Sequence, residues 1–179
     1  MSDIKSVCVF CGASNNVAKE FLDEGRELGR MIAERGMNMV FGAGDCGVMG
    51  ATANGALDAG GTVTGVFPRV LDGLEEEHKS LTETIIVDDM HTRKMNMFHK
   101  SDAFIILPGG FGTMDETFEV ITWKQLHTHN KPIIFYNYNG YWDKWVEMTN
   151  HFIDNGFASQ QTRTLYDVVD SLEEVFEKL

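Results

Sequence analysis

The sequence of 179 residues lacks the features that would place it in or beyond a membrane. It has no run of about 18 uncharged apolar residues, which a membrane-spanning helix requires. The N-terminal stretch from Met1 to Lys5 leads directly into an apolar segment, without the pattern of a signal peptide. We therefore expect a cytoplasmic protein.

Positive charge is scarce, because 15 Lys and Arg against 27 Asp and Glu give a net charge of −12. Nucleic acids and anionic membranes both bind basic surfaces, through counterion release or attraction to lipid head groups. The charge balance therefore argues against both as partners. Any phosphate that this protein binds must be captured by a local site.

Cysteine is also scarce, and its three copies are an odd number. Cys8 and Cys11 are spaced as C-x-x-C, but they lie in an apolar run and not at the start of a helix, where a redox thiol is activated. Neither the cysteines nor the six histidines have a paired metal-ligand spacing. We expect packing roles for the cysteines and no metal site.

The sequence does contain a repeated alternation of short apolar runs and helical patterns. Its length and its 43% hydrophobic content suit one well-buried domain over residues 1–179. The alternation predicts an α/β fold, a Rossmann-like, doubly wound parallel sheet flanked by helices, with ligands beyond the carboxyl ends of the strands. Expected strands are 6–10, 37–41, 62–67, 84–87, 103–107, 132–136 and 164–168; expected helices are 18–35, 48–59, 90–100, 114–127, 141–155 and 171–178.

The run from Leu107 to Glu116 joins an apolar strand to a helix through a loop that is nearly free of side chains. Its three glycines let backbone N–H groups approach a ligand closely. The unpaired N–H groups and the positive dipole end of the helix that Thr113 opens favour an anion. A phosphate is the expected ligand, with an acid beside it.

Glu116 has two interpretations at this stage. Thr113 and Glu116 have the spacing of a capping box, in which each side chain accepts a hydrogen bond from a backbone N–H group of the other residue. Alternatively, the Glu116 carboxylate stabilises positive charge on a substrate.

Arg93 and Lys94 are adjacent cations on the helix expected over residues 90–100. Met90, Met97 and Phe98 define its buried stripe, which leaves the two cations at the margins. They are either solvated surface charges or a clamp for an anion, and Arg93 is the better catalytic candidate because its guanidinium is always charged and planar.

The segment from Gly42 to Gly47 spells G-x-G-x-x-G between a strand and a helix, a pattern that also occurs in dinucleotide-binding proteins. A NAD site needs an acidic residue at the end of the next strand, but that strand ends in Val66-Phe67-Pro68-Arg69. NAD is disfavoured, whereas Arg69 leaves a contact with the 2'-phosphate of NADP open. We interpret these glycines as packing and substrate-lining residues.

Three segments of the chain resemble one family. Residues 108–116, PGGFGTMDE, match the PGGxGTxxE signature of the "Lonely guy" family of cytokinin riboside 5'-monophosphate phosphoribohydrolases, and residues 90–94 resemble its second signature. Residues 41–50 resemble the family's glycine-rich turn, with Ala43 where a third glycine is usual. The resemblance covers nearly the whole chain. Relatives have also carried the label lysine decarboxylase, but nothing in this sequence suggests a lysine that binds pyridoxal.

The resemblance implies an N-glycosidase that hydrolyses cytokinin riboside 5'-monophosphates to free base and ribose 5-phosphate, without a metal or coenzyme. It implies catalysis by Arg93 and Glu116, and a homodimer, for which the apolar helix from Met114 to Leu126 offers surface. Two alternatives remain, a general AMP or purine 5'-monophosphate nucleosidase and a non-catalytic nucleotide carrier. The implied substrate-binding residues are Glu75, Lys94, Gly109, Gly110, Phe111 (through its backbone), Gly112, Thr113, Asp115 and Thr122.

Overall fold

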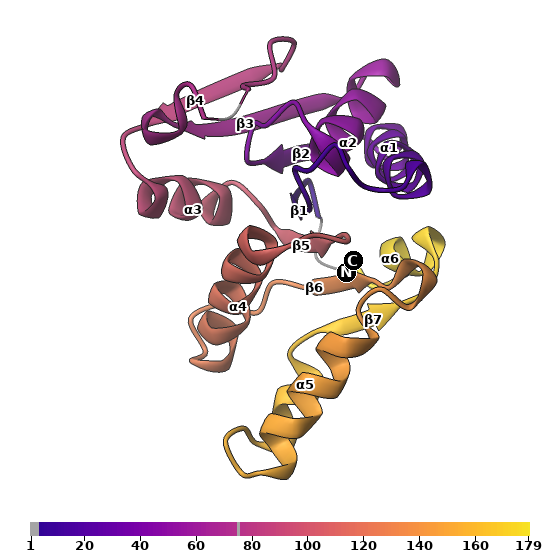
Figure 1. Cartoon of the computed structure of the whole chain (residues 1–179), viewed down its shortest axis with the longest axis vertical. Helices are drawn as coiled ribbons and strands as arrows, with labels where there is room; N and C mark the ends of the chain where they lie inside the picture. Colours follow the sequence, from indigo (N-terminus) through magenta and orange to yellow (C-terminus); the bar gives the residue numbers. More distant parts are fainter. Residues whose placement is uncertain (1–3, 75) are drawn as a thin grey trace.

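The computed structural model describes residues 4–74 and 76–179, and a seven-stranded parallel sheet runs through them (Figure 1). The strand order is β4-β3-β2-β1-β5-β6-β7. The chain builds the sheet outward from β1 to β4 and then returns to place β5 on the other side of β1. The winding therefore reverses between β1 and β5, and the expected doubly wound α/β fold is confirmed.

The bounds of the elements show where each one begins and ends. The strands are β1 (Ser6–Phe10), β2 (Asn38–Phe41), β3 (Thr62–Pro68), β4 (Glu83–Val87), β5 (Ala103–Ile106), β6 (Ile133–Tyr136) and β7 (Asp167–Val169). The α-helices are α1 (Lys19–Glu34), α2 (Gly47–Asp58), α3 (Met90–His99), α4 (Phe111–Gln125), α5 (Asp143–Asp154) and α6 (Leu172–Glu177). Short 3₁₀ helices are η1 (Arg69–Leu71), η2 (Tyr138–Gly140) and η3 (Gln160–Thr164).

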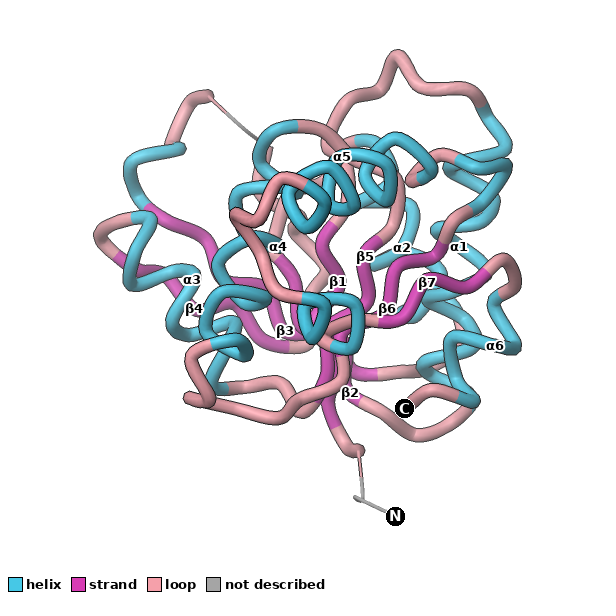
Figure 2. Tube along the Cα trace, turned by 90° about the horizontal axis from the view of Figure 1, so that it is seen from below, coloured by secondary structure: helices cyan, strands magenta, loops and turns pink. Residues whose placement is uncertain are grey.

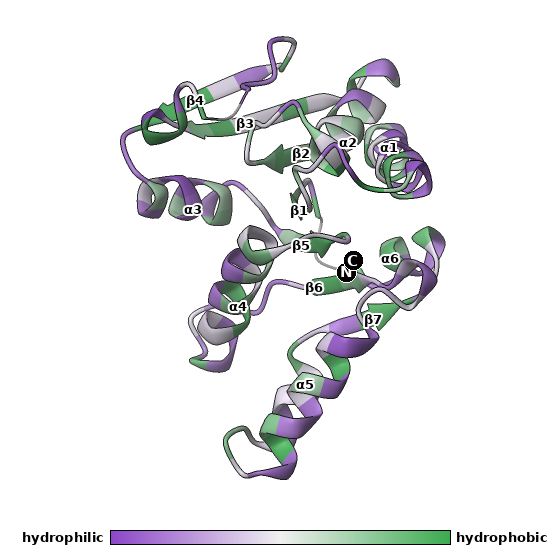
Figure 3. Ribbon diagram, viewed as in Figure 1, coloured by the Kyte–Doolittle hydropathy of each residue, from purple (hydrophilic) through white to green (hydrophobic). Residues whose placement is uncertain are grey.

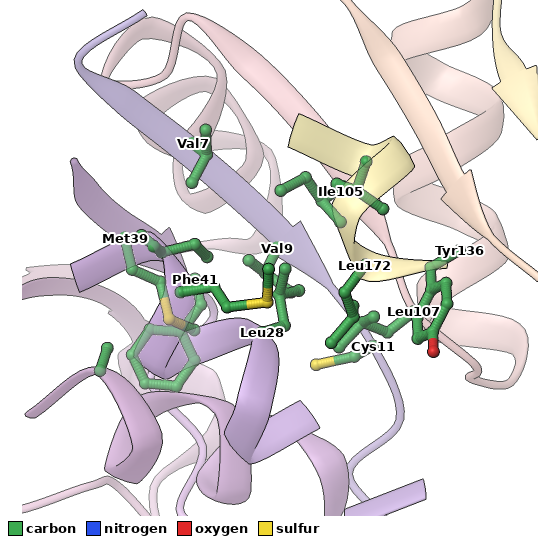
Figure 4. Close-up of a cluster of buried hydrophobic side chains, with 14 of the residues drawn as sticks. Val7, Val9, Cys11, Leu28, Met39, Phe41, Ile105, Leu107, Tyr136 and Leu172 are labelled. Carbon is green, nitrogen blue, oxygen red and sulfur yellow. The ribbon is translucent and has the colours of Figure 1, made fainter. Parts of the chain in front are cut away.

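The helices form two layers, with α1, α2 and α6 on one face of the sheet and α3, α4 and α5 on the other (Figures 1 and 2). Alternate residues of each strand point to opposite faces, so every central strand contributes to two cores. In β1, Val7 and Val9 pack toward α1 and α2 (Figure 4), whereas Cys8 and Phe10 pack toward α3 and α4. The central strands are accordingly hydrophobic along their length (Figure 3).

Most predicted elements lie close to their observed positions. The expected helix ends after residues 35 and 59 agree with the structure, since Gly36 and Gly60 adopt the left-handed conformation with φ of 69° and 76°. The last strand is displaced, because Gln160–Thr164 form η3 and strand pairing begins only at Asp167.

The predicted start of the helix at residues 113–114 and its capping box are wrong. The N-cap of α4 is Gly110, and the helix begins at Phe111. Thr113 lies buried in the first turn, and Glu116 lies in the second turn. Glu116 is therefore too far along the helix to cap it.

Candidate active site

A cavity of about 460 Å³ lies beyond the carboxyl ends of β1 and β5, where the winding of the sheet reverses. In doubly wound sheets this is the position at which ligands bind. Segments from both halves of the chain meet here. The lining residues are Cys11, Gly12, Ala13, Ser14, Val17, Phe21, Val48, Met49, Arg93, Pro108, Gly109, Gly110, Gly112, Thr113, Glu116 and Tyr141.

Three segments at the cavity are held together through Gly12. Its backbone N–H donates to the carbonyl of Pro108 over 3.0 Å, and its carbonyl accepts from the N–H of Met49 over 3.1 Å. The loop after β1, the loop after β5 and the first turn of α2 therefore form one connected rim. This rim lies at the edge of the sheet where the sequence pattern predicts ligand binding.

The glycine loop after β5 leads into α4 with its first-turn N–H groups beside the cavity. The first backbone N–H groups of a helix have no acceptor within it and favour an anion. A methyl group on Gly110 or Gly112 would meet nothing within 4 Å, so the space beside these glycines is open to a ligand. Gly109 differs, because a Cβ there would overlap the hydroxyl of Thr113.

Tyr141 binds the glycine loop through a hydrogen bond. Its hydroxyl donates to the carbonyl of Gly109 over 2.8 Å, and its ring packs edge-on against Phe21. Both aromatic residues line the cavity. The orientation of the Gly109 peptide is thus set by a residue that precedes α5.

Arg93 enters the cavity from the buried side of α3, with only 6% of its surface exposed. Its Nε donates to the carbonyl of Val66 over 3.3 Å, and its Nη2 donates to the carbonyl of Gly42 over 3.2 Å. The expected position at the margin of the buried stripe is wrong, because these carbonyls at the ends of β3 and β2 draw the guanidinium inward. A solvated surface role is excluded for Arg93.

Glu116 pairs with Arg93 at the wall of the cavity, with 3.6 Å between its Oε1 and Nη1 of Arg93 and 12% of its side chain exposed. Burial raises the pKa of Glu116 to about 7, and the nearby carboxylates of Asp115 and Glu119 also raise it. The positive charges of Arg93 and Lys94 oppose this rise. At neutral pH the carboxyl group therefore exists in both its charged and its protonated form.

The other predicted site residues divide into three groups. Gly109, Gly110, Gly112 and Thr113 line the cavity. Lys94 and Asp115 bind each other, with 3.3 Å between Nζ and Oδ2, and are not among the described residues that line the cavity. The side chain of Phe111 is 97% exposed, Thr122 is exposed on the fourth turn of α4 away from the described lining, and Glu75 lies outside the described residues.

Several lining residues were not predicted. Gly12, Ala13 and Ser14 follow a buried strand, so their place at a carboxyl end was visible, but the strand order that makes β1 the reversal point was not. Phe21 and Tyr141 carry no local signal, because only the tertiary fold brings them to this rim.

Cys8 and Cys11 have the expected packing roles. Cys8 and Cys11 are free thiols whose side chains pack on opposite faces of the sheet. Burial raises the pKa of both thiols, which keeps them protonated. They therefore cannot act together as a redox pair.

The glycine-rich turn after β2 serves protein packing. A Cβ on Gly42 would overlap the guanidinium of Arg93, and Val48 and Met49, which follow the turn, line the cavity. Arg69, the residue that left NADP open, pairs with Asp88 at 3.5 Å and is not among the described lining residues.

Solved structures share this fold. The molybdenum cofactor binding protein of Rippkaea orientalis superposes with a TM-score of 0.74 at 20% identity, covering 99% of this chain and 96% of that one. The molybdenum cofactor carrier protein of Chlamydomonas reinhardtii has a TM-score of 0.70 at 20% identity, covering 97% of this chain and 94% of that one. At such identities the likeness concerns the fold alone.

Sequence comparison is more specific. Residues 49–179 match the family model described as "Possible lysine decarboxylase". The cytokinin riboside 5'-monophosphate phosphoribohydrolase of Rhodococcoides fascians is 42% identical, over 94% of this chain and 86% of the relative. The enzyme of that name, LOG5, from Arabidopsis thaliana is 38% identical, over 99% of this chain and 78% of the relative.

No helix in the described part of the chain has both the length and the apolar character needed to cross a membrane. The three segments that resemble the "Lonely guy" signatures surround or lead into one cavity, and the relatives match over nearly the full length. The chain therefore belongs to the family of cytokinin riboside 5'-monophosphate phosphoribohydrolases.

Proposed function

We propose that this protein hydrolyses the N-glycosidic bond of cytokinin riboside 5'-monophosphates to free cytokinin base and ribose 5-phosphate. The observation that carries the proposal is the buried pair of Arg93 and Glu116, 3.6 Å apart, in one cavity with the open glycine loop. The names of the relatives supply the substrate class. The loop supplies the reason for a monophosphate, because its N–H groups suit a phosphate.

The phosphate would bind at the first turn of α4, through backbone N–H groups of Gly110, Phe111, Gly112 and Thr113. Binding energy gained at this remote group positions the ribose for reaction. Breaking the bond between base and ribose builds positive charge at C1' of the sugar. The charged form of Glu116 stabilises that charge or orients the attacking water molecule.

Arg93 contributes through its charge. A guanidinium does not give up a proton in proteins, so it cannot act as a general acid toward the departing base. Its five N–H groups allow it to hydrogen-bond the base or the ribose while it also holds Glu116 in place. In this proposal Arg93 and Glu116 act together beside the scissile bond, since their side chains lie 3.6 Å apart.

The description of the family model raises a second activity, lysine decarboxylation. Pyridoxal-dependent decarboxylation requires a lysine that holds the cofactor as a Schiff base. No lysine stands among the described residues that line the cavity. We therefore favour the phosphoribohydrolase.

The test is incubation of the pure protein with isopentenyladenosine monophosphate, AMP and the two matching nucleosides, followed by separation of the bases. The monophosphates should release base and the nucleosides should not. Equal rates on AMP and adenosine would contradict the proposal. Comparable turnover of both monophosphates would favour a general purine nucleosidase, and binding of AMP without release of base from any compound would favour a carrier.

We also propose a homodimer. Along α4, Phe118 and Leu126 are 39% and 65% exposed, and Phe111 at its start is 97% exposed. Apolar side chains in such a row favour a symmetric contact with a second copy. Light scattering should give about twice the chain mass of 20.1 kDa, and the monomer mass at micromolar concentration would contradict this proposal. Nucleic acid is not proposed as a partner, since the net charge is −12.

A further inference from the structure

A short segment between η1 and β4, residues 76–80, lies along the glycine-rich turn that follows β2. We call residues 76–80 the strap. The backbone N–H of His78 donates to the carbonyl of Ala43 over 2.9 Å. Gly44 and Glu77, the neighbours of these two residues, form an antiparallel bridge. The strap and the turn are therefore paired through their backbones, although they lie far apart in the sequence.

The side chain of His78 anchors the strap in the interior, with only 3% of its surface exposed. Its Nδ1 accepts from the backbone N–H of Ser80 over 3.2 Å, so the ring proton is carried by Nε2. Nε2 donates to Oδ1 of Asn54 in α2 over 3.2 Å, and Oδ1 of Asp45 lies 3.5 Å from the same nitrogen. One imidazole thus joins the strap, the turn and α2.

Ala43, to which the strap is bonded, has an unusual backbone conformation with φ of 65°. Residues with a Cβ are disfavoured in this left-handed region, and alanine has no polar side chain that could offset the cost locally. Its methyl group is buried, and β3 makes room for it, because a Cβ on Gly65 would lie only 2.7 Å away. A strained conformation of this kind persists when the surrounding structure holds it, and here the His78 N–H does so.

The conformation of Ala43 sets the direction of the Gly42 carbonyl. The planar peptide that joins these two residues turns as a unit with φ of Ala43. Its carbonyl accepts from Nη2 of Arg93 over 3.2 Å, whereas the carbonyl on the other side of Ala43 accepts from His78. The strap therefore holds the turn in the form that accepts the guanidinium.

We propose that His78 is a positioning residue, which holds Ala43 in its left-handed conformation so that the Gly42 carbonyl fixes the Arg93 guanidinium in the cavity. His78 is not among the described residues that line the cavity, and it acts through the turn. Its consequence for turnover rests on the proposed function. Its consequence for Arg93 does not, because the order of that side chain is measured without any substrate.

The first experiment measures hydrogen exchange of the Arg93 Nε–H, which donates to the Val66 carbonyl. The signal is followed by ¹⁵N NMR and assigned by its loss in Arg93→Lys. His78→Asn keeps an acceptor for the Ser80 N–H, but its side chain is too short to reach Asn54. Exchange should become about tenfold faster, the scale of one lost hydrogen bond, because the loosened turn no longer holds the guanidinium.

Ala43→Gly separates this positioning role from a general effect on stability. Glycine adopts a positive φ without a steric cost, so the turn keeps its form without help from the strap. In the Ala43→Gly background, His78→Asn should therefore change the exchange rate by less than about threefold. A tenfold change in both backgrounds would show that the two residues act independently, which would overturn the proposal.

Asn54→Ala tests the same hydrogen bond from the other side, and it is the variant to use if His78→Asn does not fold. It removes the acceptor of Nε2 and leaves the strap unchanged, and alanine suits the interior of α2. Exchange of the Arg93 Nε–H should again become faster, by about fivefold. An unchanged rate in either variant would overturn the proposal.

His129→Asn serves as the matched control. Nδ1 of His129 also accepts from the backbone N–H two residues on, that of Lys131, and Nε2 donates to the Val120 carbonyl over 2.8 Å. This histidine precedes β6, at the edge of the sheet opposite the cavity. The control loses a side-chain bond of the same kind but should leave the exchange of the Arg93 Nε–H unchanged.

The second experiment compares steady-state kinetics on AMP. His78→Asn should lower kcat about tenfold and leave KM within about threefold, because the phosphate site on α4 is unaltered while Arg93 is released. In the Ala43→Gly background the same substitution should lower kcat by less than about threefold. A rise of tenfold or more in KM with an unchanged kcat would overturn the proposal and make the strap a substrate contact. If the wild-type protein releases no base, the proposed function fails, while hydrogen exchange still decides this inference.

Discussion

Two glycine-rich turns lie at carboxyl ends of the sheet, and they use glycine for different purposes. In the turn after β2, Gly42 makes room for protein, since a Cβ there would overlap the Arg93 guanidinium. In the turn after β5, Gly110 and Gly112 have nothing within 4 Å of the position of a Cβ. The first turn holds a cation from the protein, and the second leaves space for an anion from outside.

This difference shows that a glycine pattern alone does not identify a ligand site. The literal G-x-G-x-x-G from Gly42 to Gly47 has the better-known pattern, yet it is filled by the protein's own arginine. The less regular loop from Gly109 to Gly112 borders the cavity. Each turn nevertheless serves one member of the proposed catalytic pair, because the first anchors Arg93 and the second begins the helix that carries Glu116.

Gly42→Ala tests the role of the first turn and should have the largest effect of the substitutions in the two turns. The added methyl group would displace the Arg93 side chain from the Gly42 carbonyl and from Glu116. We expect a loss of about a hundredfold in kcat/KM, the scale of losing one electrostatic group, and a loss of about 1–3 kcal/mol in the free energy of unfolding. Steady-state kinetics and urea unfolding measure the two. Near wild-type values in both would show that Gly42 does not support Arg93.

Glu116, on the helix that follows the second turn, titrates near neutral pH. The folded-state pKa of Glu116 is raised to about 7 from 4.5, so this group contributes most stability below pH 4.5 and loses that contribution as pH rises through 7. Glu116→Gln removes the titration. At pH 8 the variant should be more stable than wild type by about 1–3 kcal/mol, and at pH 4 the two should be equal. Lower stability of the variant at pH 8 would contradict the cause given for the shift.

Gly112→Ala tests the open space beside the second turn. Apart from the adjoining residues and the backbone of α4 itself, no described atom lies within 4 Å of the new methyl group, and alanine favours a helix more than glycine does. The free energy of unfolding should therefore rise by about 0.5–1 kcal/mol, while KM for AMP rises about tenfold because the methyl group hinders a bound phosphate. Gly109→Ala is the matched comparison. It should lower stability, because its Cβ would overlap Thr113.

Tyr141→Phe should have the smallest effect. The variant keeps the ring against Phe21 and loses only the hydrogen bond to the Gly109 carbonyl. The net value of such a bond is about 1 kcal/mol, which corresponds to a rise of about fivefold in KM for AMP. Tyr138→Phe, in the neighbouring turn, is the control and should match wild type. A Tyr141→Phe protein with unchanged KM would show that the loop holds its shape without this bond.

The sequence predicted the elements that carry periodicity and stop signals, such as the helix that ends before Gly36. The predicted start of α4 was too late. Gly112 is typical of a loop, and Thr113 and Glu116 have the spacing of a capping box. In the structure Gly110 takes the N-cap position, and Thr113 is buried in the first turn. Local patterns cannot show that tertiary packing favours helix two residues earlier than Thr113.

The sequence predicted the site residues that lie in recognisable motifs. It did not predict the contacts that depend on how the helices and loops pack together. Arg93 and Glu116 were found from motifs, but their approach to 3.6 Å depends on the packing of α3 against α4. The pairing of Lys94 with Asp115 joins residues 21 positions apart, and no periodicity within one helix reveals it. Tyr141 is still further from the loop that it holds, 32 positions along the chain from Gly109.

The most direct test of the account measures base release and AMP binding together in Glu116→Gln. Glutamine keeps the size of the side chain but offers no negative charge to a cationic transition state. The account predicts that release of base from AMP falls by about two to four orders of magnitude, the scale seen when a positioned acid-base or electrostatic group is lost, while calorimetry shows AMP binding within about threefold of wild type. Near-normal release of base by Glu116→Gln would contradict the central claim that this carboxylate acts on the bond being broken.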